Sequence, residues 1–164
     1  MLTELRIVNF AILEELSLRF EPGFTVFTGE TGAGKSLLID AIALLVGGRA
    51  SADQIRFGTE EASLEAAFHL PDRHPLQAHL RDQGILGPAD SELIVRRVIA
   101  RSGRNRVYLN GIMSSLHALE ELGGTLVDLH GQHDQQSLLA TGTQRSVVDA
   151  FGNLQERGAA YQQG

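Results

Sequence analysis

Residues 29–36 read Gly29-Glu30-Thr31-Gly32-Ala33-Gly34-Lys35-Ser36, which fits the pattern G-x-x-x-x-G-K-[ST] of a phosphate-binding loop. Lys35 is the only lysine of the 164 residues, and the other 13 residues of the 14 that are lysine or arginine are arginines. A compact ammonium group fits beside a β/γ-phosphate pair, where the planar fork of a guanidinium would not. The octet therefore predicts a nucleoside triphosphate site to which all eight residues contribute.

The segments on either side of the octet have the order that a phosphate-binding loop requires. Residues 24–28 are β-branched and aromatic and follow a turn at 22–23, so we expect a buried strand that ends where the loop begins. Residues 37–46 are almost entirely apolar and precede glycines at 47–48, so we expect a helix buried on most of its sides. In this order the loop N–H groups and the positive end of the helix face the phosphates.

Two side chains of the octet have direct chemical roles. We expect Lys35 to bridge the β- and γ-phosphates and the Ser36 hydroxyl to ligate Mg²⁺. A P-loop enzyme also needs a carboxylate at the end of a second apolar strand, and no run of four apolar residues followed by Asp-Glu occurs in the sequence. Asp128, which follows only two apolar residues, is the nearest candidate. The residues alone leave open a half-built site or a small self-contained kinase or NTPase that uses Asp128 for Mg²⁺.

The composition limits the class of protein. The chain is 43% hydrophobic and 21% charged, with a net charge of −6 and no cysteine, so we expect one globular domain, or one domain and a fragment, without disulfides. No apolar run is long enough to span a bilayer, and the N-terminus lacks the pattern of a signal peptide. We therefore expect a cytoplasmic protein with no membrane partner. The acidic balance excludes a polycation, so any contact with DNA needs a local patch.

The hydrophobic pattern of the rest of the chain predicts alternating strands and short helices. We expect strands at 2–9, 13–20, 63–70, 92–100, 106–109 and 125–129. We expect helices at 74–83, at 114–122 with a stop at the glycines 123–124, and from 143 onward. The pair Asn110-Gly111 predicts a tight turn.

Five segments together carry a pattern more specific than the octet. They read Asn9-Phe10-Ala11-Ile12-Leu13-Glu14-Glu15-Leu16, Phe20-Glu21-Pro22-Gly23, the run 28–36, Gly47-Gly48-Arg49-Ala50 and Asp128-Leu129-His130-Gly131-Gln132-His133. They closely resemble the N-terminal part of the RecN family, bacterial DNA double-strand-break repair ATPases related to the SMC proteins. The resemblance runs over most of residues 1–151.

The resemblance implies a fold and a domain organisation. The fold would be α/β, a P-loop NTPase head of the ABC/SMC type, here its N-terminal lobe with an antiparallel β-subdomain packed on the P-loop core. Residues 1–151 would form the N-terminal half of the head, and residues 152–164 would begin a coiled-coil helix. The rest of the coil and the C-terminal half-head, which carries the signature segment, the Walker B aspartate and the catalytic glutamate, would be absent from this chain.

The resemblance also implies a function. The chain would be the ATP-binding half of a Mg-dependent ATPase that acts in DNA double-strand-break repair and recombination, and it would be incomplete without the C-terminal half-head. Two heads would sandwich ATP and form a homodimer, with DNA as the further partner. The protein would be cytoplasmic and associated with the nucleoid. A nucleotide-gated structural clamp with negligible turnover remains a second alternative.

Further site residues follow from the same resemblance. Gln132 matches the Q-loop glutamine, whose amide can coordinate Mg²⁺ and orient an attacking water, so Ser36 and Gln132 would be the metal ligands. Arg56 matches the arginine of the SMC-type R-loop, and Arg49 is a competing candidate. The expected catalytic set is therefore Lys35, Gln132 and Arg56.

A predicted hairpin is rich in arginine. Five arginines lie within eleven residues: Arg96, Arg97, Arg101, Arg104 and Arg106. One interpretation is salt-dependent contact of this hairpin with DNA phosphates, with contact through parts outside this chain also left open, and Tyr108 as the only aromatic nearby gives no indication of base stacking. The alternative is a solvated edge hairpin that its charges protect from aggregation.

Overall fold

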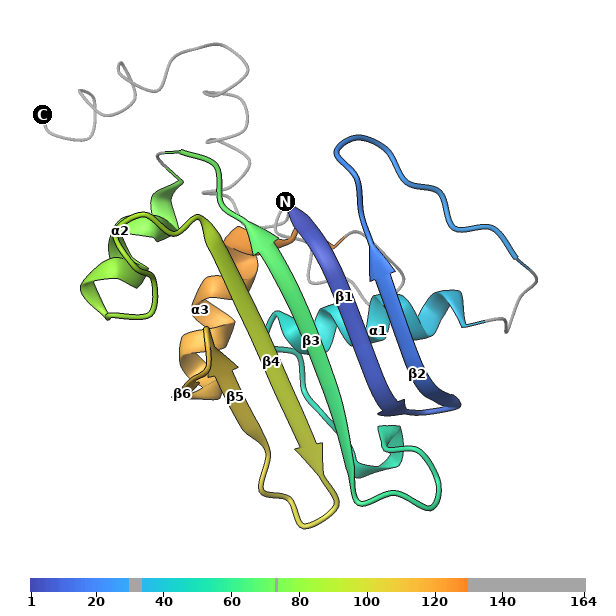
Figure 1. The fold of residues 1–164 in the computed structure, drawn as a ribbon. Coiled ribbons are helices and arrows are strands. Elements are labelled where there is room, and N and C mark those ends of the chain that lie inside the picture. Colours follow the sequence, from blue (N-terminus) through green and yellow to red (C-terminus); the bar gives the residue numbers. More distant parts are fainter. Residues whose placement is uncertain (30–33, 73, 130–164) are drawn as a thin grey trace, which may run out of the picture. The chain divides into compact units, whose positions relative to one another are not determined.

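A six-stranded antiparallel sheet organises the residues that the computed structural model describes, which are 1–29, 34–72 and 74–129 (Figure 1). The strand order is β2-β1-β3-β4-β5-β6. The strands are β1 Leu2–Phe10, β2 Leu13–Arg19, β3 Glu61–His69, β4 Glu92–Ala100, β5 Arg106–Leu109 and β6 Ile112–Ser114. The first five confirm the strands expected from the hydrophobic alternation. The expected boundary between residues 151 and 152, and the start of a coiled coil, lie outside the described residues.

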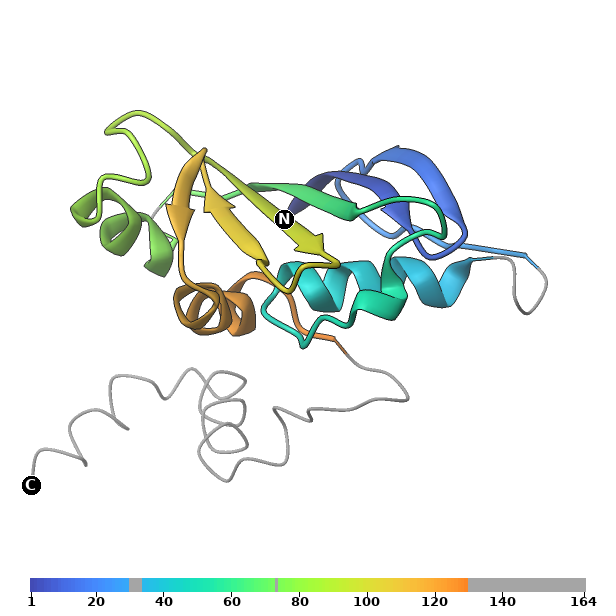
Figure 2. The same cartoon turned by 90° about the horizontal axis from the view of Figure 1, so that it is seen from below.

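Helices cover one face of this sheet. They are α1 Lys35–Leu45, α2 Pro75–Asp82 and α3 Leu116–Leu126, with a short 3₁₀ turn η1 at Ala52–Gln54. Figure 2 shows α1 and α3 on the same side of the sheet, where α1 contacts β3 and β4 and α3 contacts β5. No helix in the described ranges is long and apolar enough to cross a membrane.

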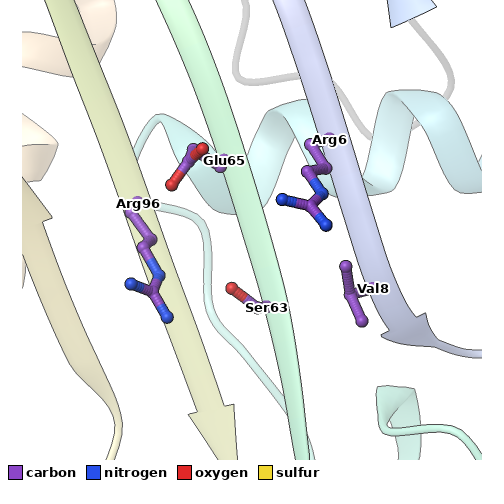
Figure 3. A pocket seen from close by; sticks show the side chains of 5 residues that line it. All are labelled: Arg6, Val8, Ser63, Glu65 and Arg96. Carbon is purple, nitrogen blue, oxygen red and sulfur yellow. The ribbon is translucent and has the colours of Figure 1, made fainter. Parts of the chain in front are cut away.

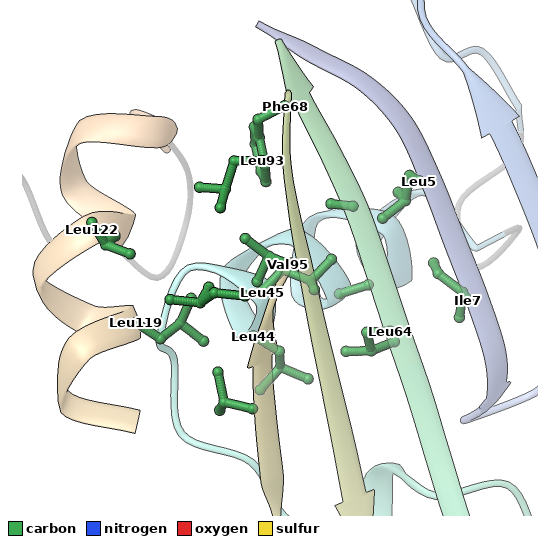
Figure 4. Close-up of a cluster of buried hydrophobic side chains, with 14 of the residues drawn as sticks. Leu5, Ile7, Leu44, Leu45, Leu64, Phe68, Leu93, Val95, Leu119 and Leu122 are labelled. Atoms are coloured by element: carbon green, nitrogen blue, oxygen red, sulfur yellow. The ribbon is translucent and has the colours of Figure 1, made fainter. Parts of the chain in front are cut away.

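The hydrophobic core lies between the sheet and these two helices (Figure 4). Alternate residues of β4, such as Leu93 and Val95, point inward, and they meet Leu44 of α1 and Leu119 of α3 in one buried cluster. Burial of a side chain of this size contributes about 1.5–3 kcal/mol. The period-two pattern of the strands therefore fixes which face of the sheet the helices cover.

The segment before the octet differs from the expectation. Residues 24–28 were predicted to form a buried strand, but they form no strand, and Phe24 is 93% exposed and Phe27 46% exposed. A strand needs a neighbour to satisfy its backbone N–H and C=O groups. Edge strand β2 pairs only with β1 in the described sheet, and no described strand pairs with residues 24–28. The prediction of a buried strand is wrong for this structure.

Helix α1 is also less buried than expected. Its buried residues are Ala41, Leu44 and Leu45, whereas Ile39 is 52% exposed. The helix is therefore buried along one side and not on most sides. Leu37, Leu38 and Ile42 are partly buried against the same core.

The glycines at 123–124 do not end a helix. Helix α3 continues through them to Leu126, and the amide of Val127 still donates to the Gly123 carbonyl at 3.1 Å. The expected strand at 125–129 does not form in the described residues. A Cβ atom at Gly123 would lie 2.0 Å from the Val46 carbonyl oxygen, so the glycine permits close helix packing instead of acting as a stop signal.

The turn at Asn110-Gly111 is confirmed, and it leads into the unexpected strand β6. Both residues have positive φ, 47° and 80°, as a tight hairpin turn of this type requires. The side chain of Asn110 also accepts a hydrogen bond from the Ile94 amide at 2.7 Å, which ties the hairpin to β4.

Candidate nucleotide-binding site

The two ends of the octet lie together. Its described residues are Gly29, Gly34, Lys35 and Ser36, while residues 30–33 lie outside the described part. The Lys35 ammonium donates a hydrogen bond to the Gly29 carbonyl oxygen. Gly34 has φ of 90°, in the left-handed region that favours glycine, and this turns the chain from the loop into α1. The hydrogen bond therefore joins the first residue of the octet to its lysine.

The N-terminus of α1 offers hydrogen-bond donors to a ligand. Gly34 occupies the N-cap position and provides no side-chain cap, and the first helical bond runs from the Leu38 amide to the Gly34 carbonyl at 3.2 Å. The amides of residues 35–37 precede that bond and lie at the positive end of the helix. Ser36 is exposed in the first turn. An ammonium group, the amides of the first helical turn and a hydroxyl form a set of groups that fits a Mg²⁺-bound triphosphate.

A buried arginine of β4 binds the opposite end of α1, where it was not expected. Arg97 of β4 is 1% exposed, and its Nη1 donates to the carbonyl oxygens of Leu44 at 2.5 Å and Gly48 at 2.6 Å. Burial lowers the pKa of the Arg97 guanidinium, and the nearby negative charge of Glu120 opposes that shift. A positive group at the C-terminus of a helix is favourable because it complements the helix dipole.

The expectation that Arg97 belongs to a DNA-binding surface is therefore wrong. A signal for its true place was present in β4, where Leu93, Val95 and Ile99 alternate as inward residues and Arg97 occupies the same phase. An arginine inside a hydrophobic alternation indicates a buried partner. The number of arginines in the hairpin suggested an exposed basic surface, whereas the position of Arg97 in the strand pattern indicates the buried face.

Two other hairpin arginines are bound within the fold. Arg101 donates to the Thr59 carbonyl at 2.8 Å and also approaches the carbonyl of Ile55. Arg106 binds the Glu61 carboxylate through two contacts of 2.5 and 2.6 Å. Within the described ranges this leaves Arg96 and Arg104 as the hairpin arginines without a hydrogen bond or ion pair, and the Arg96 guanidinium lies 5.8 Å from the centroid of the Tyr108 ring.

Arg96 lines a shallow hollow on the face of the sheet away from the helices. The hollow measures about 330 Å³ and is lined by Arg6, Val8, Ser63, Glu65 and Arg96 (Figure 3). Glu65 pairs in register with Arg6 on one side and Arg96 on the other, so charges of both signs alternate across three strands. None of the residues that line the hollow belongs to the octet. The two arginines of the lining are accompanied by the carboxylate of Glu65, so the hollow is not purely positive.

The structure brings Arg56 to the turn between β1 and β2. Its Nη1 donates to the Ile12 carbonyl at 2.7 Å, and its Nη2 lies 3.6 Å from Glu14 Oε2. Its backbone amide donates to the Asn9 carbonyl at 2.9 Å. The competing candidate, Arg49, is exposed after the end of α1. The geometry of the R-loop candidate is thus set by the β1–β2 turn.

The two remaining candidates for metal ligands are Gln132 and Asp128. Gln132 lies outside the described residues. Asp128 follows α3 in a segment without helix or strand, so it does not end a second apolar strand.

Comparison with protein families and known sequences identifies relatives of the chain. The family model for an AAA domain matches residues 4–146. The DNA repair protein RecN of Bacillus subtilis strain 168 is 45% identical over 166 residues, which covers 100% of this chain and 29% of that protein. RecN of Vibrio cholerae is 42% identical over 151 residues, covering 92% of this chain and 27% of that protein. The chain therefore spans less than a third of the length of these curated relatives.

Comparison with solved structures tests the fold. A structure from work on ATP-driven dimerization and DNA-stimulated activation of SMC ATPases superposes with a TM-score of 0.64 at 21% identity, covering 90% of this chain and 97% of that chain. This likeness confirms the expected fold class, an α/β P-loop fold of the SMC head type.

Proposed function

Because the chain belongs to the AAA domain family and is a relative of the DNA repair protein RecN, we propose that it is the ATP-binding half of an ATPase head that acts in DNA double-strand-break repair and recombination. One observation carries this proposal. The Lys35 ammonium donates a hydrogen bond to the Gly29 carbonyl, and Gly34 leaves the N-terminus of α1 without a side-chain cap. This arrangement presents an ammonium group and helix amides to one ligand, as a triphosphate requires.

The chain's own residues would divide the chemistry among them. The octet amides and Lys35 hold the β- and γ-phosphates, and the Ser36 hydroxyl and Gln132 amide ligate Mg²⁺. Bound Mg²⁺ supplies positive charge that neutralises the phosphate oxygens. Hydrolysis would be an in-line attack of water on the γ-phosphorus that breaks its bond to the β–γ bridging oxygen and releases ADP and phosphate, with Gln132 orienting the water and Arg56 coupling the site to DNA or to the second head. Catalysis in such a site comes from positioning and charge stabilisation.

The exposed segment before the octet supports an incomplete site. Phe24, Val26 and Phe27 are all exposed although their sequence is that of a buried strand. The chain spans 29% of the Bacillus subtilis relative. We infer that strands of a C-terminal half-head pair with residues 24–28, and that this half-head brings the missing carboxylates. On this basis the chain alone binds ATP with little turnover.

The partners we propose are a second head and DNA. Head pairing would be driven by ATP, because each octet would be completed by the partner's signature segment. DNA phosphates would contact Arg96 and Arg104, the hairpin arginines without a hydrogen bond or ion pair in the described part of the chain, and also parts beyond this chain. We place the protein in the cytoplasm with the nucleoid.

The test is a titration of the 164-residue chain with Mg-ATP beside a turnover assay, with Lys35→Ala as the matched variant. Binding without turnover, lost in Lys35→Ala, is the expected result. Absence of binding by the parent chain would overturn the proposal. Turnover by the parent chain that disappears in both Lys35→Ala and Asp128→Ala would instead establish the self-contained NTPase.

A further inference from the structure

Two residues from distant parts of the chain, Arg97 and Gly123, contact the C-terminal end of α1. Arg97 donates to the carbonyls of Leu44 and Gly48 across sequence separations of 53 and 49 residues. Gly123 of α3 lies against the Val46 carbonyl. The end of α1 is therefore fixed from the sheet and from α3 together.

This end is connected to the phosphate-binding loop by one short helix. Helix α1 has 11 residues and begins at Lys35, so its two ends are about 16 Å apart. An α-helix of this length is stiff, and a shift at Leu44 is carried to the first turn. The first turn has no side-chain cap of its own, and Ile39 near it is half exposed. The position of Lys35 and Ser36 thus depends on contacts at the far end of the helix.

Burying the charged guanidinium of an arginine carries a desolvation cost that offsets much of what it contributes to stability at a helix end. Arg97 is almost fully buried, and its Nε has no hydrogen-bond partner in the described part of the chain. An apolar side chain of similar volume in such a position is often as stabilising or more so. The two hydrogen bonds to the Leu44 and Gly48 carbonyls, in contrast, constrain where the end of α1 lies relative to β4. This geometry favours a role in placement over a role in stability alone.

We propose that Arg97 is a positioning residue of the nucleotide site: by binding the Leu44 and Gly48 carbonyls it sets the place of α1, and through α1 the place of Lys35 and Ser36. The proposal rests on the function proposed above. Arg97 itself contacts no nucleotide and acts only through the helix.

The experiment compares Arg97→Met, which keeps the volume but removes the donors, with Arg97→Lys, which keeps the charge on a shorter side chain. Arg19→Met is the matched control, because Arg19 is an exposed sheet arginine paired only with Glu4. Two readouts are taken on the 164-residue chain well below its melting temperature. They are the Kd for Mg-ATP and hydrogen exchange of the amides in the first turn of α1.

The expected result is a Kd about tenfold weaker in Arg97→Met and about threefold weaker in Arg97→Lys, because the binding-competent placement of the loop is less populated. Exchange in the first turn rises in the same order, and Arg19→Met changes neither readout. A purely structural role predicts a lower melting temperature with unchanged Kd and unchanged exchange in the folded protein, and that result overturns the proposal.

Two further outcomes are decided in advance. If Arg97→Met does not fold, Arg97→Lys decides alone, and parental Kd and exchange in that variant overturn the proposal. If the parent chain binds no Mg-ATP, the proposed function fails, while first-turn exchange still shows whether Arg97 places α1. Raised exchange in Arg97→Met then supports the positional role, and parental exchange overturns it.

Discussion

Gly123 lies so close to Val46 that a Cβ atom on the glycine would sit 2.0 Å from the Val46 carbonyl oxygen. We expect Gly123→Ala to lower the free energy of unfolding by about 2–3 kcal/mol, because the carbonyl is backbone and cannot move aside cheaply. The matched control is Gly124→Ala, where nothing lies within 4 Å of the added Cβ. That variant should gain up to about 1 kcal/mol from helix propensity. Urea unfolding of both variants checks the contrast, and equal effects would refute it.

Asn110 combines a positive φ with three side-chain hydrogen bonds. Its Oδ1 accepts from Ile94, and its Nδ2 donates to the carbonyls of Ile85 at 3.0 Å and Glu92 at 3.2 Å. We expect Asn110→Ala to cost about 3 kcal/mol, from lost hydrogen bonds and a left-handed backbone that alanine resists. Asn110→Gly should cost about 1–2 kcal/mol less, because glycine adopts the same φ without strain. Thermal or chemical unfolding measures the difference, and a glycine variant no more stable than the alanine variant contradicts the strain argument.

Ser36 should act through the metal. We expect Ser36→Ala to weaken ATP binding about tenfold in Mg²⁺ and to leave binding in EDTA unchanged, because the hydroxyl is proposed to ligate the cation and not the phosphates. Isothermal titration with and without Mg²⁺ provides the comparison. Ser17→Ala, an exposed serine of β2, is the control. An equal loss in both buffers would exclude the metal role.

Phe24 and Phe68 differ in their exposure to solvent: Phe24 lies on the surface and Phe68 lies in the hydrophobic core. Phe24 is 93% exposed and Phe68 is 1% exposed. We expect Phe24→Ser to change the free energy of unfolding of this chain by less than about 0.5 kcal/mol and Phe68→Ser by about 4 kcal/mol. Phe24→Ser should also reduce self-association of the chain, measured by light scattering against concentration. A large loss of stability in Phe24→Ser would show that the segment is already packed.

Much of the β-sheet could be predicted from the sequence, because period-two alternation depends on local residues only. The strand at 92–100 shows this, since exposed and buried residues alternate from Glu92 to Arg97. The failures involve contacts between distant segments. The glycines at 123–124 are locally a helix stop, and only the approach of α1 explains why the helix continues. Residues 24–28 are locally a strand, and the described sheet provides no neighbour for them.

The candidate site divides in the same way. The motif predicted Lys35 and Ser36 directly before a helix at 37–46, and the structure begins that helix two residues earlier, at Lys35. Arg56 could be singled out by resemblance, but its contacts with Ile12 and Glu14 could not be deduced from spacing. Arg97 was assigned to the wrong face because the number of arginines in the hairpin was weighed and their phase in the strand was not.

The contacts of Arg97 and Gly123 with the end of α1 have a consequence for folding during synthesis. Ribosomes deliver Lys35 long before Arg97 and Gly123, yet those later residues contact the end of the helix that begins at Lys35. Contacts across such separations form slowly, because a long loop must close first. During synthesis the octet therefore exists well before its supporting contacts do. On the positioning role proposed for Arg97, the nascent chain would acquire a shaped nucleotide site only after the chain through α3 has been synthesised.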